Sequence, residues 1–131
     1  MREAEKREKR GKTMAILFVE YPKCSTCQKA KAWLDAHGVA YTDRDITVEN
    51  PTAQELAAWA EKGGLPLEKF RNASGLKYKA LGLAARWPEM SGEEKREALA
   101  ADGMLVKRPV AVGEDFVLTG FREAEWAAKL L

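Results

Sequence analysis

The sequence is poor in cysteine, in histidine and in excess charge of either sign, and these scarcities exclude several classes of protein. Its 131 residues include two cysteines and one histidine, and the net charge is +2. A secreted disulfide scaffold spreads its cysteines along the chain, whereas both cysteines here fall in one four-residue window. A dedicated nucleic-acid binder carries a much larger positive charge, so we expect no direct nucleic-acid partner.

Long hydrophobic runs are also missing. No apolar segment approaches the roughly 18 residues of a membrane span, and no apolar stretch follows the charged N-terminus, as it would in a secretory signal. We therefore expect a cytoplasmic protein without a membrane partner. Residues 1–13 are almost all charged and are predicted to be a disordered tail. Residues 14–131 are long enough for one compact domain.

Hydrophobic periodicity predicts an α/β domain whose first part is a strand–helix–strand unit. Residues 15–20 form a short apolar run that is typical of a buried strand. Apolar residues at helical spacing predict a helix over about 24–37, and residues 39–46 alternate as a second strand. A right-handed crossover then makes these two strands parallel.

The rest of the domain is predicted to be a helical insert over about 51–104, followed by a hairpin and a final helix. Two capping boxes begin helices in the insert, Thr52 with Glu55 and Ser91 with Glu94, and two short helices are expected within 65–82. The hairpin strands are predicted at 110–112 and 116–118, and the last helix at 123–131. The order is βαβ, helical insert, ββα. The four tryptophans are expected in the core.

The two cysteines, Cys24 and Cys27, follow the first strand and begin the first helix. The C-x-x-C spacing lets the two sulfurs meet in a disulfide. At a helix N-terminus, unpaired backbone N–H groups and the helix dipole favour a thiolate, and Lys23 adds positive charge. Cys24 is therefore predicted to be the attacking thiolate and Cys27 the resolving thiol. A structural zinc site needs four ligands, which two cysteines and His37 do not supply, so no metal is expected.

Four separated motifs resemble the arsenate reductase (ArsC) family, including its Spx-type regulators. They are Y-P-K-C-S-T-C-Q-K-A at 21–30, D-R-D-I at 43–46, K-R-P-V at 107–110 and G-F-R at 120–122. The resemblance implies a thioredoxin-like fold with a helical insertion. It also implies that Pro109 is the cis-proline facing the active cysteine, and that Arg71, Arg108 and Arg122 bind an oxyanion substrate such as arsenate. Arginine forks pair well with tetrahedral oxyanions and hold a nearby thiolate ionised.

Reductases that use glutathione and glutaredoxin carry a single cysteine in this loop, in a sequence resembling H-N-P-x-C. The second cysteine of this chain is more similar to the Spx branch, so we expect Cys27 to resolve an adduct on Cys24. The expected enzyme is a thiol–disulfide oxidoreductase without a bound cofactor, acting on a small oxyanion or thiol substrate. Glutathione, glutaredoxin or thioredoxin would supply electrons. The alternative is a redox-sensing regulator that binds RNA polymerase. Spx-type regulators continue beyond the last helix, whereas this chain ends at Leu131, which favours the enzyme.

Overall fold

A computed structural model describes residues 15–131, which form a mixed four-stranded sheet with helices on both faces. The predicted tail over 1–13 lies outside the described residues. The strands are β1 (Ile16–Glu20), β2 (Tyr41–Asp45), β3 (Val110–Val112) and β4 (Val117–Thr119). Their order in the sheet is β2-β1-β3-β4, with β1 and β2 parallel and the other two pairs antiparallel. None of the helices in the described part of the chain is long and apolar enough to cross a membrane.

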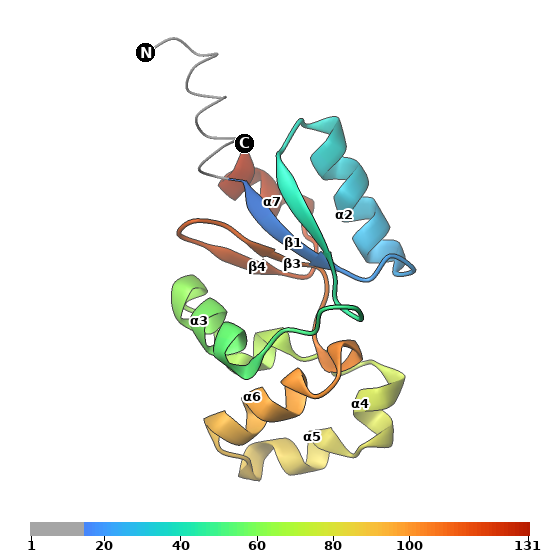
Figure 1. Cartoon of the computed structure of the whole chain (residues 1–131), viewed down its shortest axis with the longest axis vertical. Helices are drawn as coiled ribbons and strands as arrows, with labels where there is room; N and C mark the ends of the chain where they lie inside the picture. The colour runs from blue at the N-terminus through green and yellow to red at the C-terminus, as the bar shows by residue number, and fades with distance from the viewer. Residues whose placement is uncertain (1–14) are drawn as a thin grey trace.

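One face of the sheet is covered by α2 (Ser25–Ala36) and α7 (Glu123–Leu130), as Figure 1 shows. Alternate residues of β1 point to this face, where Ile16 and Phe18 pack with Trp33 and Trp126. The indole N–H of Trp126 donates to the carbonyl of Gly120 at 3.0 Å. This bond anchors the start of α7 to the end of the hairpin, because Gly120 directly follows β4.

The helical insert packs against the opposite face of the sheet and extends below it (Figure 1). Its core joins Leu56, Trp59 and Phe70 to the side chains of Val19 and Val110 from the sheet. The elements of the insert are α3 (Ala53–Gly63), η1 (Leu67–Phe70), α4 (Leu76–Ala80), α5 (Leu83–Arg86), η2 (Trp87–Glu89), α6 (Gly92–Ala100) and η3 (Gly103–Leu105).

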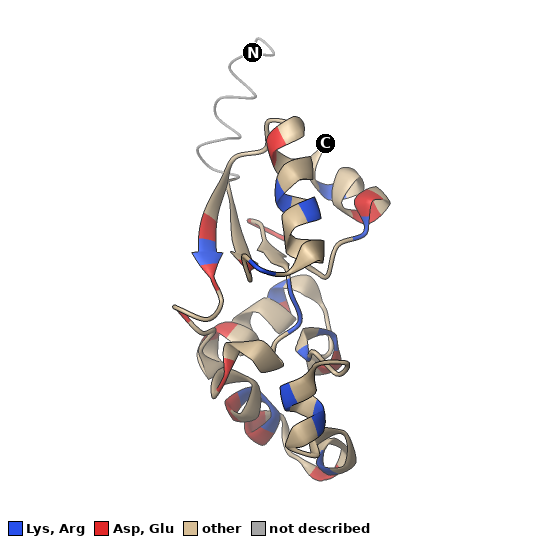
Figure 2. Cartoon of the chain, turned by 90° about the vertical axis from the view of Figure 1, so that its right-hand side faces the viewer, with Lys and Arg blue, Asp and Glu red and all other residues tan. Residues whose placement is uncertain are grey.

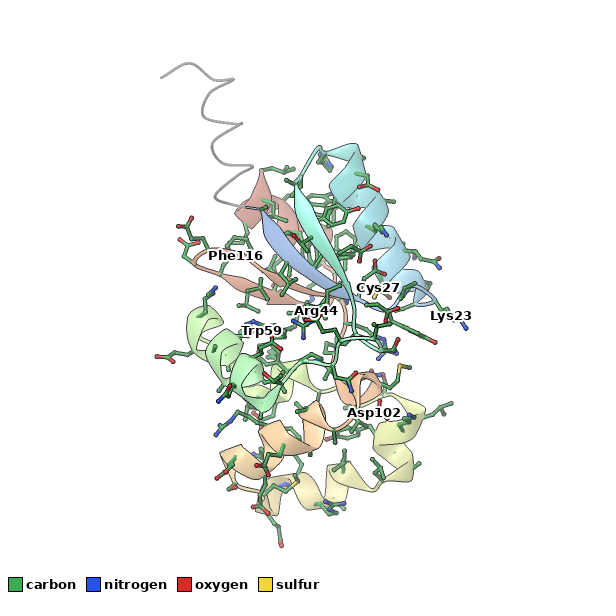
Figure 3. All side chains as sticks on the ribbon, viewed as in Figure 1. Lys23, Cys27, Arg44, Trp59, Asp102 and Phe116 are labelled. Carbon is green, nitrogen blue, oxygen red and sulfur yellow. The ribbon has the colours of Figure 1, made fainter. Side chains whose placement is uncertain are left out.

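The buried guanidinium of Arg44 connects the insert to the sheet. The Arg44 side chain donates to both carboxylate oxygens of Glu55 at 2.8 and 2.9 Å, and to the carbonyl oxygens of Glu49 and Asn50. Figure 3 shows Arg44 beside Trp59, between the sheet and α3, and its guanidinium carbon lies 5.8 Å from the centre of that ring. The D-R-D-I motif therefore has a structural role, since its arginine connects β2 to the first helix of the insert.

The predicted α/β class and the order of elements are confirmed, as are both capping boxes and the burial of all four tryptophans. Two details were wrong. The second hairpin strand begins one residue later than predicted, because the amide of Gly113 bonds the carbonyl of Phe116 at 2.9 Å and makes Phe116 part of the turn. The sequence prediction also missed α5 and η2. They are short, and they are held in place by burial of Leu83 and Trp87 against the rest of the insert.

Candidate active site

Cys24 occupies the N-cap position of α2, at the end of the loop that follows β1. The loop turns tightly, since the amide of Cys24 donates to the carbonyl of Tyr21 at 2.9 Å. The backbone of Cys24 is extended, with φ −83° and ψ 125°, while its carbonyl already accepts the helical bond from Gln28. In this geometry an N-cap side chain lies beside the unpaired N–H groups of the first helical turn. The Cys24 thiol is half-buried, and both cysteines are unbridged.

The environment of Cys24 favours its thiolate. Partial burial by itself raises the pKa of this thiol. The nearby backbone N–H groups of Cys27 and Thr26, the Cys27 thiol and the positive charge of Arg108 outweigh burial, so that the net pKa is lowered. The prediction from the C-x-x-C spacing relied on the helix N-terminus and on Lys23 for this effect. In the structure the guanidinium of Arg108 is the charged group that acts on the sulfur, and Lys23 extends outward from the loop (Figure 3).

Cys27 lies on the inward face of α2 and behaves in the opposite way. Its side chain is fully buried. Burial is the main cause that raises the pKa of Cys27 to about 12, and the neighbouring thiolate of Cys24 and carboxyl of Glu20 raise it further. The amide of Tyr21 donates to its sulfur at 3.5 Å, which only partly offsets these effects. The pair is therefore asymmetric, with an accessible, acidic thiol and an enclosed, weakly acidic one.

A cluster of charged side chains under α2 was missed in the sequence analysis. Glu20 ends β1 and is 2% exposed, and its Oε2 lies 3.4 Å from Nζ of Lys31. Lys31 also bonds Asp43 of β2 at 2.6 Å. Burial and the hydrogen bond and charge of Asp43 raise the pKa of Glu20 to about 7. The only sequence signal was an acidic residue that closes an otherwise apolar strand.

Arg108 approaches the cysteines from the loop that leads into β3, and its peptide bond to Pro109 is cis. Its guanidinium carbon lies 5.3 Å from the centre of the Tyr21 ring, and Nη1 donates to the carbonyls of Met104 and Val106 at 3.3 and 3.4 Å. The Nε of Arg108 is buried and has no hydrogen-bond partner among residues 15–131. A buried N–H without a partner costs free energy, so this donor is suited to an incoming acceptor.

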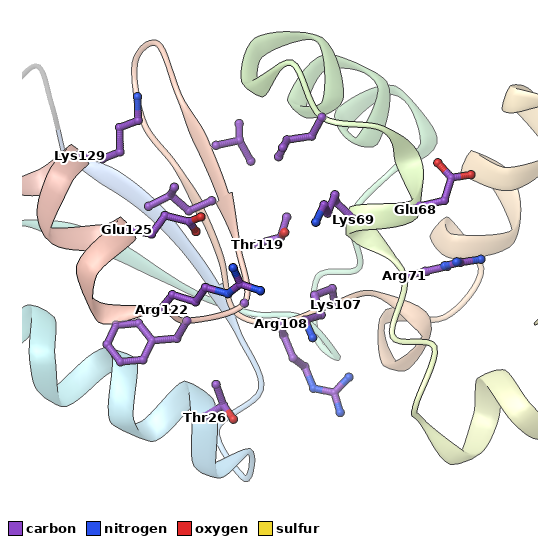
Figure 4. Close-up of a pocket in the computed structure, with 15 residues that line it drawn as sticks. Thr26, Glu68, Lys69, Arg71, Lys107, Arg108, Thr119, Arg122, Glu125 and Lys129 are labelled. Atoms are coloured by element: carbon purple, nitrogen blue, oxygen red, sulfur yellow. The ribbon is translucent and has the colours of Figure 1, made fainter.

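All three predicted arginines line one basic cleft between the hairpin, the start of α7 and the insert (Figure 4). The cleft has a volume of about 550 Å³ and is also bordered by Thr26, two residues after Cys24. Six basic and two acidic side chains line it: Lys69, Arg71, Lys107, Arg108, Arg122, Lys129, Glu68 and Glu125. Basic residues gather at this junction of sheet and insert (Figure 2). The cleft therefore favours an anionic ligand.

The three arginines are not equally available in the cleft. Arg122, at the N-cap of α7, is exposed, and Figure 4 shows that it reaches toward the middle of the cleft. Arg71 extends away from Arg122 in the same view. Its Nη1 bonds the hydroxyl of Tyr78 at 3.2 Å, and its guanidinium carbon lies 5.1 Å from the centre of a Trp87 ring. Contact of Arg71 with a bound anion would require a different rotamer.

Metal ligation has no geometric support in the described part of the chain. Within residues 15–131, no three His, Cys, Asp or Glu side chains are grouped so that they could hold a metal ion. His37 instead caps the end of α2, and its ring lies 4.5 Å from that of Trp33.

Comparison with known proteins finds relatives that match most of the chain. The model of the ArsC family matches residues 19–129. The uncharacterized protein YusI of Bacillus subtilis is 45% identical over 113 residues, covering 86% of this chain and 96% of its own. The global transcriptional regulator Spx of Streptococcus agalactiae is 29% identical over 120 residues, covering 89% of this chain and 83% of its own. The crystal structure of an ArsC-related protein from Bacteroides fragilis superposes with a TM-score of 0.84 at 51% identity, covering 88% of this chain and 98% of its own.

Proposed function

The chain belongs to the ArsC family, and on that premise we propose that it is a thiol–disulfide oxidoreductase in which Cys24 attacks and Cys27 resolves. The asymmetry of the two thiols carries this proposal. A half-buried Cys24 with a lowered pKa is the more available nucleophile, whereas Cys27 is enclosed and has a pKa of about 12. Such a pair reacts in a defined order, because Cys24 loses its proton at a lower pH than Cys27 does.

In the first step the Cys24 thiolate attacks a sulfur of a disulfide substrate. The substrate S–S bond breaks, one thiolate leaves with the electron pair, and a mixed disulfide forms on Cys24. Cys27 then attacks Sγ of Cys24, expels the second thiolate and leaves a Cys24–Cys27 disulfide. The substrate has gained two electrons and the cysteine pair has lost them. Thioredoxin, glutaredoxin or glutathione would return the electrons to the pair by thiol exchange.

Arsenate is the oxyanion that we propose as an alternative substrate of the same site. The Cys24 thiolate would bond to arsenic and displace hydroxide. Attack of Cys27 on Sγ would then release arsenic with the S–As electron pair, as arsenite. The basic cleft, the exposed Arg122 and the unpartnered Nε of Arg108 support binding of a tetrahedral anion. Since free thiol pairs persist in reducing compartments, we also propose that the reaction takes place in the cytoplasm.

The test combines a thiol titration with an assay of turnover. Alkylation of Cys24 as a function of pH should give a pKa below the ordinary value of about 8.5. Oxidation of NADPH should depend on substrate when thioredoxin, or glutaredoxin with glutathione, is coupled to the protein. The Cys24→Ser variant should have no activity, and Cys27→Ser should accumulate the mixed disulfide. An ordinary Cys24 pKa would refute the thiol mechanism. Absence of arsenate-dependent oxidation with either donor would refute only the arsenate substrate.

The similarity to Spx favours a second candidate function, a redox-sensing regulator. Formation of a Cys24–Cys27 disulfide would pull the first turn of α2 and alter the charge beside Arg108, and so change the surface presented to RNA polymerase. Pull-down of RNA polymerase by the oxidised and the reduced protein distinguishes the two functions. Stable binding by the oxidised form alone, without turnover of any disulfide, would favour the regulator.

A further inference from the structure

The carboxyl group of Glu20 is buried on the side of the sheet where Cys27 lies. Ile16 and Phe18 of β1 pack under α2, and Glu20 continues the same alternation at the end of the strand. Cys27 belongs to the inward face of α2 together with Ala30 and Leu34. The amide that follows Glu20, that of Tyr21, donates to the sulfur of Cys27 at 3.5 Å. Strand end and sulfur are therefore in direct contact.

Lys31 also lies beside the carboxyl group of Glu20. It lies one helical turn after Cys27, on the same side of α2, and its Nζ is 3.4 Å from Oε2 of Glu20. That oxygen is buried and has no hydrogen-bond partner within residues 15–131. Glu20 is also close enough for its charge to act on the Cys27 thiol. The oxygen can take up a proton without losing a hydrogen bond of good geometry, although the Lys31 ammonium favours its charged form.

We propose that Glu20 is the proton acceptor for Cys27 in the resolving step, an inference that rests on the proposed function. The Cys27 thiol cannot attack until it loses its proton, and Cys24 cannot accept that proton because its sulfur is bonded to the substrate. The proton passes to the Glu20 carboxylate. The Cys27 sulfur bonds to Sγ of Cys24, the mixed-disulfide bond breaks, and the substrate thiolate leaves with the electron pair. Reduction of the Cys24–Cys27 disulfide returns the proton.

The other charged groups around the site are poorer acceptors. Lys31 and Arg108 are cations. Asp43, on β2, is more exposed; although burial raises its pKa, hydrogen bonds with Glu20 and Lys31 lower it overall. Asp45 is a partly exposed carboxylate whose pKa is lowered mainly by hydrogen bonds from Thr47. The residues of β3 beside β1 are apolar. The pKa of Glu20, about 7, matches an acceptor that works at neutral pH.

The test separates the two chemical steps with dithiobis(nitrobenzoate), a disulfide whose thiol product is coloured. Mixed in excess with reduced protein, it should release one thiol when Cys24 attacks and a second when Cys27 resolves. Glu20→Gln keeps the shape of the protonated side chain and can still donate to Asp43. We expect the first phase to change by less than about twofold and the second to slow by about tenfold or more, in the lower range of general-base effects. Glu97→Gln, an exposed change on α6, should alter neither phase.

The pH dependence of the second phase distinguishes proton transfer from a structural role. In the unmodified protein its rate should level off above the Glu20 pKa of about 7, whereas in Glu20→Gln it should keep rising with hydroxide. Because Asp43 helps to raise that pKa, Asp43→Asn should move the inflection to lower pH and retain it. This second variant also serves if Glu20→Gln does not fold.

Two results would overturn the inference. If the unmodified protein shows both phases and Glu20→Gln has the same second-phase rate and inflection, Glu20 is not the acceptor and the proposed function stands. An inflection that Asp43→Asn leaves in place has the same meaning. If the unmodified protein lacks a fast first phase, the proposed function itself fails, and the role of Glu20 fails with it.

Discussion

Alkylation of the reduced protein with iodoacetamide should modify Cys24 and spare Cys27. At about pH 7, a thiol with an ordinary pKa near 8.5 is about 3% ionised. Cys27, with a pKa of about 12, is ionised in about one molecule in 10⁵, a deficit of about 3,000-fold. A more basic thiolate is intrinsically more nucleophilic, which recovers a factor of about 30 to 60 over this pKa difference. Ionisation therefore dominates, and Cys27 should react about 10²-fold more slowly than an ordinary thiol.

The difference between the two cysteines should be larger still, for two reasons. Cys24 has a lowered pKa, and Cys27 is fully buried, so the reagent must wait for a local opening of the structure. Limited labelling followed by mass spectrometry of the peptides measures the ratio of the two rates. Protein unfolded in denaturant is the control, because both cysteines should then react at similar rates.

The Cys24→Ser variant tests the causes of this asymmetry. It removes the charge that the Cys24 thiolate directs at Cys27, but it leaves the larger cause, burial, in place. Cys27 should therefore label faster in Cys24→Ser than in the unmodified protein, and still more slowly than an ordinary thiol. Equal labelling of both cysteines in the unmodified protein, or an ordinary rate for Cys27 in the variant, would refute the reasoning.

Three further predictions concern stability. Trp126→Ala removes a buried ring and the bond to the Gly120 carbonyl, and should lower the free energy of unfolding in urea by about 3–5 kcal/mol. A loss of free energy as small as that of a surface substitution would contradict the burial of this ring in the core. Thr52→Ala breaks the capping box with Glu55 and should cost about 0.5–2 kcal/mol in the same assay. Because its folded pKa is raised above the ordinary value of 4.5, Glu20 binds its proton more tightly in the folded state, and its stabilising effect is lost as pH rises through about 7. Glu20→Gln should therefore gain stability relative to the unmodified protein between about pH 5 and about pH 8, as thermal unfolding at both values can show; a constant difference would argue against the raised pKa.

Much of the framework followed from local patterns. The helix that follows Cys24 and the two capping boxes are properties of short segments, because backbone hydrogen bonds and side-chain periodicity act over a few residues. The boundaries of the helices and strands were harder to predict. The sequence did not show that α5 and η2 form, since these depend on burial of Leu83 and Trp87 against the rest of the insert. It also did not show that Phe116 belongs to the turn, where the Gly113 amide bonds its carbonyl.

The C-x-x-C pair and its position after a buried strand were enough to predict a thiol centre and which cysteine attacks. The tertiary structure decided how the two thiols differ. The pKa of Cys27 rises because strands and helices from across the sequence bury it, and the pKa of Cys24 falls partly because Arg108 arrives from a loop more than half the chain away. The tertiary structure likewise directed Arg71 toward Tyr78 and buried Glu20 beside Lys31 of α2. Burial and charge at a sulfur are sums over everything nearby in space, and no local pattern contains them.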